Sequence, residues 1–224
     1  MIEIISKTAD YVIVYKPSGI PSQSDPSGDP DAMTLCSQML RENGQSDTLY
    51  LIHRLDRVVG GIMVFARNKR TAAILSEQVA DHSFEKHYFA IVEGKADGGV
   101  LVDYLYKDAR LNKAVVTDNK RSGAKLAELE YHLLDSVETQ NRQISLVKIK
   151  LKSGRFHQIR AQFSSRKMPL IGDKKYGSRD FKAKTPSLFA TELGFVINKK
   201  EIKASRLPLL TEYPWSLFSE DKYD

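Results

Sequence analysis

The residues with the clearest chemical potential lie in the segment His53-Arg-Leu-Asp-Arg57, which Gly60-Gly61 follows closely. Asp56 stands between Arg54 and Arg57, and neighbouring positive charge favours the ionised form of a carboxyl group. An ionised carboxylate at a strand end can serve as a nucleophile, a general base or an electrostatic stabiliser. A single aspartate between arginines is also typical of a structural ion pair or loop cap, so the residue types alone leave its role open.

A second candidate is Tyr88, which lies within Lys86-His-Tyr-Phe-Ala-Ile-Val-Glu-Gly94. On a strand, Lys86, Tyr88 and Ala90 share one face because successive side chains point to opposite faces. Composition favours a core aromatic with a satisfied hydroxyl over a ring that lines a pocket. Both interpretations require a strand at this point of the chain.

The third candidate region combines Gly154-Arg-Phe-His-Gln-Ile-Arg160 with the glycine-punctuated segment 169–177. Breaks in regular structure here expose backbone N–H groups beside basic side chains, which suits phosphate and carboxylate contacts. His157 is favoured as a structural histidine, because no second His or Cys stands at metal-ligand spacing. The glycines match neither a P-loop nor a dinucleotide fingerprint, so we expect no metal and no nucleotide cofactor.

Strands and a few helices must position these residues. Apolar runs and alternation predict strands at residues 11–15, 62–66, 87–92, 128–137 and 144–152, and a pair of short strand-like runs in 188–197; helical spacing predicts helices at 32–43, 70–82 and 157–165. We expect a loop at 22–31, an extended piece at 51–56 and a chain break at Gly60-Gly61. Because the order lacks βαβ regularity, we expect a single α+β domain, residues 1–224, with a large mixed, mainly antiparallel β-sheet, flanking helices and an active-site cleft across the sheet.

Charge is unevenly distributed along the 224 residues, whose overall formal charge is +6. Residues 1–53 carry a net charge of −4, whereas residues 146–184 carry +10. Alternation places Lys148, Lys150 and Lys152 together on a basic strand face that is exposed to water. A local excess of this size favours nucleic acid as partner over a merely solvated surface, and over a membrane, since no basic amphipathic helix is present.

The remaining composition indicates an ordinary globular protein, with 42% hydrophobic and 28% charged residues. The only cysteine, Cys36, has no partner for an internal disulfide, and the N-terminus does not resemble a signal peptide. No apolar run approaches the roughly 18 residues that span a bilayer. We therefore expect a cytoplasmic protein that does not associate with membranes.

The blocks, taken in order, resemble the RluA family of RNA pseudouridine synthases. The resemblance is carried by Tyr15-Lys-Pro-Ser-Gly19, His53-Arg-Leu-Asp56, Lys86–Gly94, Gly154–Arg160 and Ile171-Gly-Asp-Lys-Lys-Tyr-Gly177. This resemblance implies an isomerase that converts specific uridines of structured rRNA or tRNA to pseudouridine without cofactor or metal. It implies a monomer without a separate N-terminal RNA-binding module.

The resemblance also assigns roles to individual residues. Asp56 matches the essential aspartate, Tyr88 the tyrosine that packs on the base, and Arg160 the basic residue that pairs with the aspartate. Arg54 matches an arginine that fills the space left by a flipped-out nucleotide. The predicted RNA contacts are Arg54, Arg57, Arg155, His157, Gln158, Lys174 and Lys175.

Some positions depart from the family pattern. A Thr-Ser-Gly turn usually follows the aspartate, whereas Val59-Gly60-Gly61 stands here, and Gln162 and Phe189 each replace a usual histidine. None of these positions is Asp56, Tyr88 or Arg160, so we expect an active, divergent enzyme. The alternatives are a catalytically weak RNA-binding or RNA-folding protein on the same scaffold and, less favoured, a DNA-binding protein, for which no helix-turn-helix or zinc signature is present.

Overall fold

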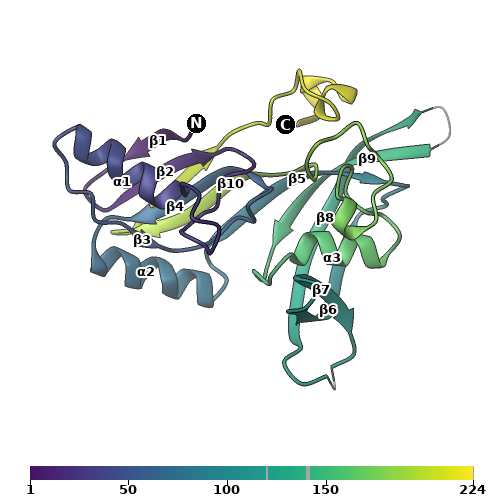
Figure 1. Cartoon of the computed structure of the whole chain (residues 1–224), viewed down its shortest axis with the longest axis horizontal. Helices are drawn as coiled ribbons and strands as arrows, with labels where there is room; N and C mark the ends of the chain where they lie inside the picture. The colour runs from purple at the N-terminus through teal and green to yellow at the C-terminus, as the bar shows by residue number, and fades with distance from the viewer. Residues whose placement is uncertain (120, 140–141, 224) are drawn as a thin grey trace. The chain divides into compact units, whose positions relative to one another are not determined.

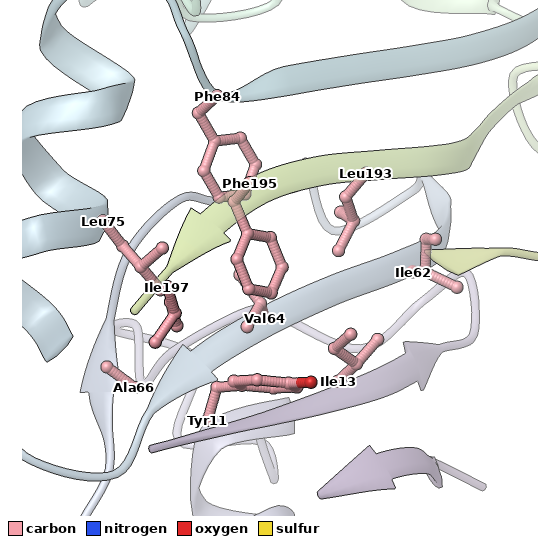
Figure 2. Packing of buried hydrophobic residues seen from close by; sticks show 10 residues of the cluster. All are labelled: Tyr11, Ile13, Ile62, Val64, Ala66, Leu75, Phe84, Leu193, Phe195 and Ile197. Carbon is pink, nitrogen blue, oxygen red and sulfur yellow. The ribbon is translucent and has the colours of Figure 1, made fainter. Parts of the chain in front are cut away.

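A computed structural model describes residues 1–119, 121–139 and 142–223 (Figure 1). The chain folds into two compact units: residues 1–86 with 190–206, and residues 87–189 with the described residues from Leu207 onward. The printed pairings within each unit are antiparallel, whereas the neighbours β4 and β10 of the first unit run in the same direction (Figure 2), so the predicted α+β class and the mixed, mainly antiparallel sheet are confirmed. That the two units act as one catalytic domain stays a prediction.

The first unit contains a strand array flanked by two helices. Its elements are β1 (Glu3–Lys7), β2 (Tyr11–Lys16), α1 (Ala32–Glu42), β3 (Tyr50–Leu51), β4 (Gly60–Ala66), α2 (Lys69–Ala80), most of β10 (Leu188–Ile197) and β11 (Lys200–Ser205). The strands follow the order β1-β2-β4-β10-β11, and β3 pairs with β4. Figure 1 shows α1 along one side of these strands and α2 along the other.

Alternate residues of three central strands build the core of this unit (Figure 2). Tyr11 on β2 meets Phe195 on β10 edge to face, with ring centroids 5.3 Å apart. Phe195 also stacks on Phe84 at 5.6 Å, and Leu75 from α2 joins the cluster. The opposite face is buried too, since Val12 and Met63 are fully buried. Strands covered on both faces explain why β2 and β4 read as continuous apolar runs.

Polar caps fix where both helices begin. Asp31 accepts a hydrogen bond from the Thr34 N–H at 3.0 Å, and Asn68 accepts one from the Thr71 N–H at 2.8 Å. Such side chains satisfy N–H groups that the first turn of a helix leaves without partners. The helices predicted at 32–43 and 70–82 are confirmed, with ends shifted by one or two residues.

The second unit is a curled antiparallel array with one helix packed on it. Its elements are most of β5 (Glu85–Glu93), β6 (Gly99–Asp108), β7 (Lys113–Thr117), β8 (Lys125–Thr139), β9 (Arg142–Leu151), α3 (Gln158–Ser165) and the short 3₁₀ helices η1 (Lys174–Tyr176), η2 (Trp215–Leu217) and η3 (Glu220–Tyr223). The strands follow the order β5-β9-β8-β6-β7.

Both faces of this second array are partly covered. Phe163 of α3 packs edge to face on Tyr131 of β8, with centroids 5.0 Å apart. A separate cluster joins Phe89 of β5 and Leu146 of β9 to Phe218 and Tyr223 of the C-terminal segment. These contacts hold α3, and with it Arg160, in a defined place relative to β8.

Two local predictions are wrong. Gly60 and Gly61 do not break the chain but begin β4, and residues 188–197 form one ten-residue strand, not two short runs. The predicted alternation in β9 is confirmed, since the half-buried Lys148 and Lys150 alternate with buried Val147, Ile149 and Leu151. The first half of the lysine face is apolar, because Ile144 and Leu146 are buried in the cluster around Phe89.

Candidate active site

Asp56 lies in the first unit, at the start of a tight turn between the extended segment after β3 and the beginning of β4. Its carbonyl accepts the Val59 N–H at 2.9 Å, and its side chain is half-buried. The preceding Leu55 exchanges two hydrogen bonds with Ser22, its N–H donating at 3.0 Å and its carbonyl accepting at 2.8 Å. These bonds fix the backbone on both sides of the carboxylate.

Lys16 contacts the same turn through a backbone carbonyl, a role that the sequence analysis did not predict. Its side chain is fully buried, and its amine donates to the carbonyls of Pro17 at 3.1 Å, Ile20 at 2.7 Å and Arg57 at 3.4 Å. Burial lowers the pKa of Lys16 to about 7, while the charge of Asp56 acts in the opposite direction. The signal in the sequence was a lysine directly before Pro-Ser-Gly, where a turn carries backbone carbonyls that need donors.

Gly61 shows why a glycine follows this turn. Its φ is +135°, and a Cβ there would lie 2.4 Å from the carbonyl oxygen of Ala190 on β10. No side chain fits such a contact, so the residue must be glycine for β4 to lie beside β10. The departure from the family's usual Thr-Ser-Gly therefore keeps the glycine and changes the two residues before it.

The two arginines beside Asp56 differ in their surroundings. Arg54 is exposed, whereas Arg57 is tied to the loop at residues 22–31. The Arg57 guanidinium forms an ion pair with Asp29, donates to Ser27 at 3.1 Å and donates to the Gly19 carbonyl at 3.0 Å. The hydrogen bond with Asp29 raises the pKa of Arg57 above its ordinary value. Arg57, which was predicted to contact RNA, therefore has protein partners in this structure.

His53 is a neutral, structural member of the same block. Its Nε2 accepts the Val64 N–H at 3.2 Å, and its ring lies 5.5 Å from that of Phe84. Burial lowers the pKa of His53 to about 3, and the charge of Lys86 acts in the same direction. His53 therefore anchors the segment that leads to Asp56 onto β4.

Tyr88 and Arg160 lie in the second unit. Tyr88 is buried on β5, 6% exposed, opposite Ile149 of β9. Arg160 is 4% exposed on α3, and its guanidinium binds Asp173 through two hydrogen bonds of 2.6 Å and 2.9 Å. Asp173 is thus the buried partner of Arg160, a pairing that the sequence analysis did not predict. The predicted pairing of Arg160 with Asp56 joins residues of different units and stays a prediction.

A cluster of rings surrounds the start of α3. The ring of His157 stacks on Phe156 at 3.8 Å, and its Nδ1 lies 2.9 Å from the hydroxyl of Tyr176. That hydroxyl also accepts the Ala114 N–H at 2.7 Å, which ties β7 to η1. His157 has a left-handed backbone with φ of 48°, and this conformation turns the chain into α3.

The electrostatic environment of His157 is strongly positive. Burial lowers the pKa of His157 to about 3, and the charges of Arg160, Lys175 and Lys107 act in the same direction. Lys107 itself lies 4.6 Å from the centre of the Phe156 ring. The imidazole is therefore neutral at physiological pH, in a region where basic side chains concentrate.

The other predicted RNA contacts divide into buried and exposed residues. Gln158 is 3% exposed, and its amide accepts from Ser153 at 2.8 Å and donates to the Glu128 carbonyl at 3.0 Å. Its hydrogen bonds hold the turn before α3. Arg155 is exposed and donates to the Leu126 carbonyl at 2.9 Å, and Lys174 and Lys175 are exposed on η1.

Neither a metal cluster nor a membrane-spanning helix is found in the part of the chain that the structure describes. Across 1–119, 121–139 and 142–223, no three His, Cys, Asp or Glu side chains gather closely enough to hold a metal ion. None of the helices in this part of the chain has the length and apolar character of a membrane span.

Comparison with known proteins identifies the family to which these residues belong. The family model described as RNA pseudouridylate synthase matches residues 10–165, which include Asp56, Tyr88 and Arg160. The chain belongs to the RluA family of RNA pseudouridine synthases. It is accordingly an RNA pseudouridine synthase, an isomerase, as the sequence blocks predicted.

Individual relatives agree with this assignment. The tRNA pseudouridine synthase C of Haemophilus ducreyi is 31% identical over 183 residues, which cover 79% of this chain and 74% of that protein. The ribosomal large subunit pseudouridine synthase D of Borreliella burgdorferi is 28% identical over 95% of this chain and 65% of its own length. The solved structure of human RNA pseudouridylate synthase domain containing 4 shares the fold, with a TM-score of 0.74, 21% identity, and coverage of 92% of this chain and 89% of that chain.

Proposed function

We propose that this enzyme isomerises one or more uridines in structured tRNA or rRNA, with Asp56 as the catalytic carboxylate and Tyr88 and Arg160 as the other residues of the active site. The observation that carries the proposal is the family match, whose range, residues 10–165, includes the blocks of all three residues. The names of relatives include both tRNA and ribosomal enzymes, which is why either RNA is a candidate.

The reaction explains why a carboxylate is needed. The bond between N1 of uracil and C1′ of ribose breaks, the base rotates, and C5 bonds to C1′ while the C5 proton moves to N1. Cleavage of a glycosidic bond develops positive charge on the sugar, which a neighbouring carboxylate stabilises or captures covalently. No electrons are gained or lost overall, so Asp56 together with a proton relay is sufficient chemistry.

The surroundings of Asp56 support this role. Hydrogen bonds of Leu55 with Ser22 and of Val59 with the Asp56 carbonyl hold its backbone, which limits reorganisation during the reaction. The amine of Lys16 links this turn to the segment after β2, because it donates to the Arg57 carbonyl and to the carbonyls of Pro17 and Ile20. A carboxylate held this firmly can be aimed at one atom of the substrate.

Tyr88 and Arg160 then complete the site. A tyrosine ring stacks on uracil, and its hydroxyl can relay the proton from C5. Arg160 supplies positive charge that keeps a carboxylate ionised away from water. The exposed Arg54 stacks into the gap that a flipped-out uridine leaves, which offsets a few kcal/mol of unstacking.

The deciding experiment maps pseudouridine in tRNA and rRNA incubated with the wild type and with Asp56→Asn. We expect the wild type to modify defined uridines and the variant to lose about 10³-fold or more in single-turnover rate, because the ionised carboxylate is gone. RNA affinity should stay within a few fold. The matched control is Glu77→Gln, which removes an exposed carboxylate from α2 of the same unit and should leave the rate unchanged. Turnover by Asp56→Asn at the wild-type rate would refute the assignment.

The same proposal extends to the state of the protein in the cell, as a cytoplasmic monomer. The support for the cytoplasm is its one cysteine, Cys36, which is buried, and burial raises the pKa of that thiol to about 11. A thiol of this kind is unreactive and requires no oxidising compartment. Light scattering of the purified protein tests the monomer, and a mass above that of one chain would contradict it.

A further inference from the structure

Phe181 is the most exposed Phe, Tyr or Trp among the residues that the structure describes, with 78% of its area accessible. Single exposed apolar residues are common and need no explanation by themselves. Phe181 differs because of where it stands, on the loop that follows η1, between Ser178 and Thr185. The amine of Lys174 lies 5.4 Å from the centre of its ring.

The loop that presents Phe181 is held rigidly from inside. The neighbouring Asp180 is buried and accepts hydrogen bonds from Arg142 at 2.6 Å and from the Tyr213 hydroxyl at 2.6 Å. The same carboxylate accepts the backbone N–H groups of Lys182 and Ala183, each at 2.9 Å. The backbone on both sides of Phe181 is therefore fixed, and the ring is displayed by a preorganised turn.

A second anchor lies two residues further along each arm of the loop. The Ser178 hydroxyl donates to Glu93 at 2.6 Å and accepts the Gly172 N–H at 3.0 Å. A Cβ on Gly172 would lie 2.4 Å from the carbonyl oxygen of Thr185, so the two chain segments touch through their backbones. Because both arms are anchored, the loop backbone loses no further conformational entropy when a ligand binds to the ring.

The exposed charged side chains of η1 and of the loop that carries this ring are all positive. Asp180, the one acid of the loop, is buried and paired, whereas the charged side chains that reach solvent on the loop and on η1 are Lys174, Lys175, Arg179, Lys182 and Lys184. Among the residues that the structure describes, none of these five cations forms an ion pair. Cations that track phosphates beside an aromatic ring that stacks on a base are the two components of single-strand RNA recognition.

We infer that Phe181 is a base-stacking contact for RNA, on a basic loop formed by residues 174–184, outside the residues assigned to catalysis. The inference rests on the proposed function, since that function supplies the RNA. The base stacks on the Phe181 ring, and the surrounding lysines and Arg179 contact the phosphates on either side of it. Such stacking is tolerant of base identity, so the loop adds affinity and orientation without reading sequence.

The test compares RNA with and without bases. Fluorescence anisotropy would measure the affinity of the wild type, Phe181→Ala and Phe181→Trp for a labelled single-stranded oligouridine and for an abasic ribose–phosphate strand of equal length. We expect Phe181→Ala to bind oligouridine about fivefold or more weakly, because one stacked base is lost. Both variants should bind the abasic strand as the wild type does. Phe181→Trp should keep the affinity, and its fluorescence should be quenched by oligouridine alone.

Val196→Ala is the matched control, since Val196 is 45% exposed on β10, a strand that itself contains no Lys or Arg. An equal loss on both strands by Phe181→Ala would overturn the inference, as would unchanged affinity for oligouridine, which would leave the ring to a protein partner. Pseudouridine formation is measured separately on tRNA and rRNA. If the wild type forms no pseudouridine, the proposed function is refuted. The difference in affinity between oligouridine and the abasic strand still tests the role of Phe181.

Discussion

The loop around Asp56 and the loop around Phe181 handle their charges in opposite ways. In the first, the acids Asp25 and Asp29 lie exposed and face Arg57, whose guanidinium they hold in an ion pair. In the second, the acid Asp180 is buried and neutralised by Arg142, while the lysines point outward. In the first loop, Arg57 is used to hold a turn. In the second loop, Asp180 holds the backbone, and the exposed lysines stay available to contact phosphates.

This difference shows why net charge by segment overstates an RNA-binding surface. The +10 excess of residues 146–184 includes Arg160, which is buried with Asp173, and Arg166, which pairs with Asp103 of β6 at 2.9 Å. Charges in such pairs are already balanced within the protein and release few counterions when RNA binds. The cations that remain are concentrated on η1 and on the loop after it.

The largest effect should come from breaking the buried pair of the second unit. Asp173→Asn leaves the Arg160 guanidinium buried without its carboxylate, and the loss of one partner of a buried pair costs about 3–5 kcal/mol. Urea unfolding would measure this loss. Asp29→Asn, which breaks the exposed pair of the first unit, should leave the urea midpoint unchanged, because water replaces the lost partner. Equal destabilisation by both variants would contradict this contrast between a buried and an exposed ion pair.

The buried pair also marks the limit of what the sequence could predict. The blocks around Asp56, Tyr88 and Arg160 were found because residue type and order identify a family, and the strands and helices followed from apolar periodicity. The sequence did not show that Asp173 binds Arg160 or that Lys16 donates to backbone carbonyls, because these contacts form only when the chain is folded. Gly61 was misread as a break, since only the approach of Ala190 shows that the glycine serves a strand.

Lowering the pH should have an intermediate effect on the free energy of unfolding. Burial lowers the pKa of His157 to about 3, with neighbouring cations acting in the same direction, and an unfolded histidine has a pKa near 6.5. Between these values the unfolded chain binds a proton that the folded protein does not, so stability falls as pH decreases from about 6.5 towards 3. The slope for one such histidine is at most about 1.4 kcal/mol per pH unit, and solvent around this half-buried ring reduces it.

The measurement is urea unfolding at a series of pH values, with His157→Gln as the comparison. This variant removes the titrating group, so its stability should fall less steeply with acid than that of the wild type. His53, whose pKa burial also lowers to about 3, titrates in both proteins and supplies the slope that remains. Identical slopes for the variant and the wild type would show that His157 is exposed to protons in the folded protein.

The smallest effects should appear in the salt dependence of RNA binding, where the two loops can be compared cation by cation. Lys174→Ala combined with Lys175→Ala removes two exposed cations that form no ion pair in the described residues, and each phosphate contact contributes about 0.7 to the slope of log K against log salt on single strands. The double variant should therefore flatten the slope by up to about 1.4. Arg57→Gln also removes a cation, but one that Asp29 already neutralises, so the slope should stay as in the wild type and affinity should change less than about twofold. If Arg57→Gln flattened the slope as much per charge as the lysine variant, Arg57 would have to leave Asp29 for a phosphate when RNA binds, and the acids of the first loop would act as a counterion that RNA displaces.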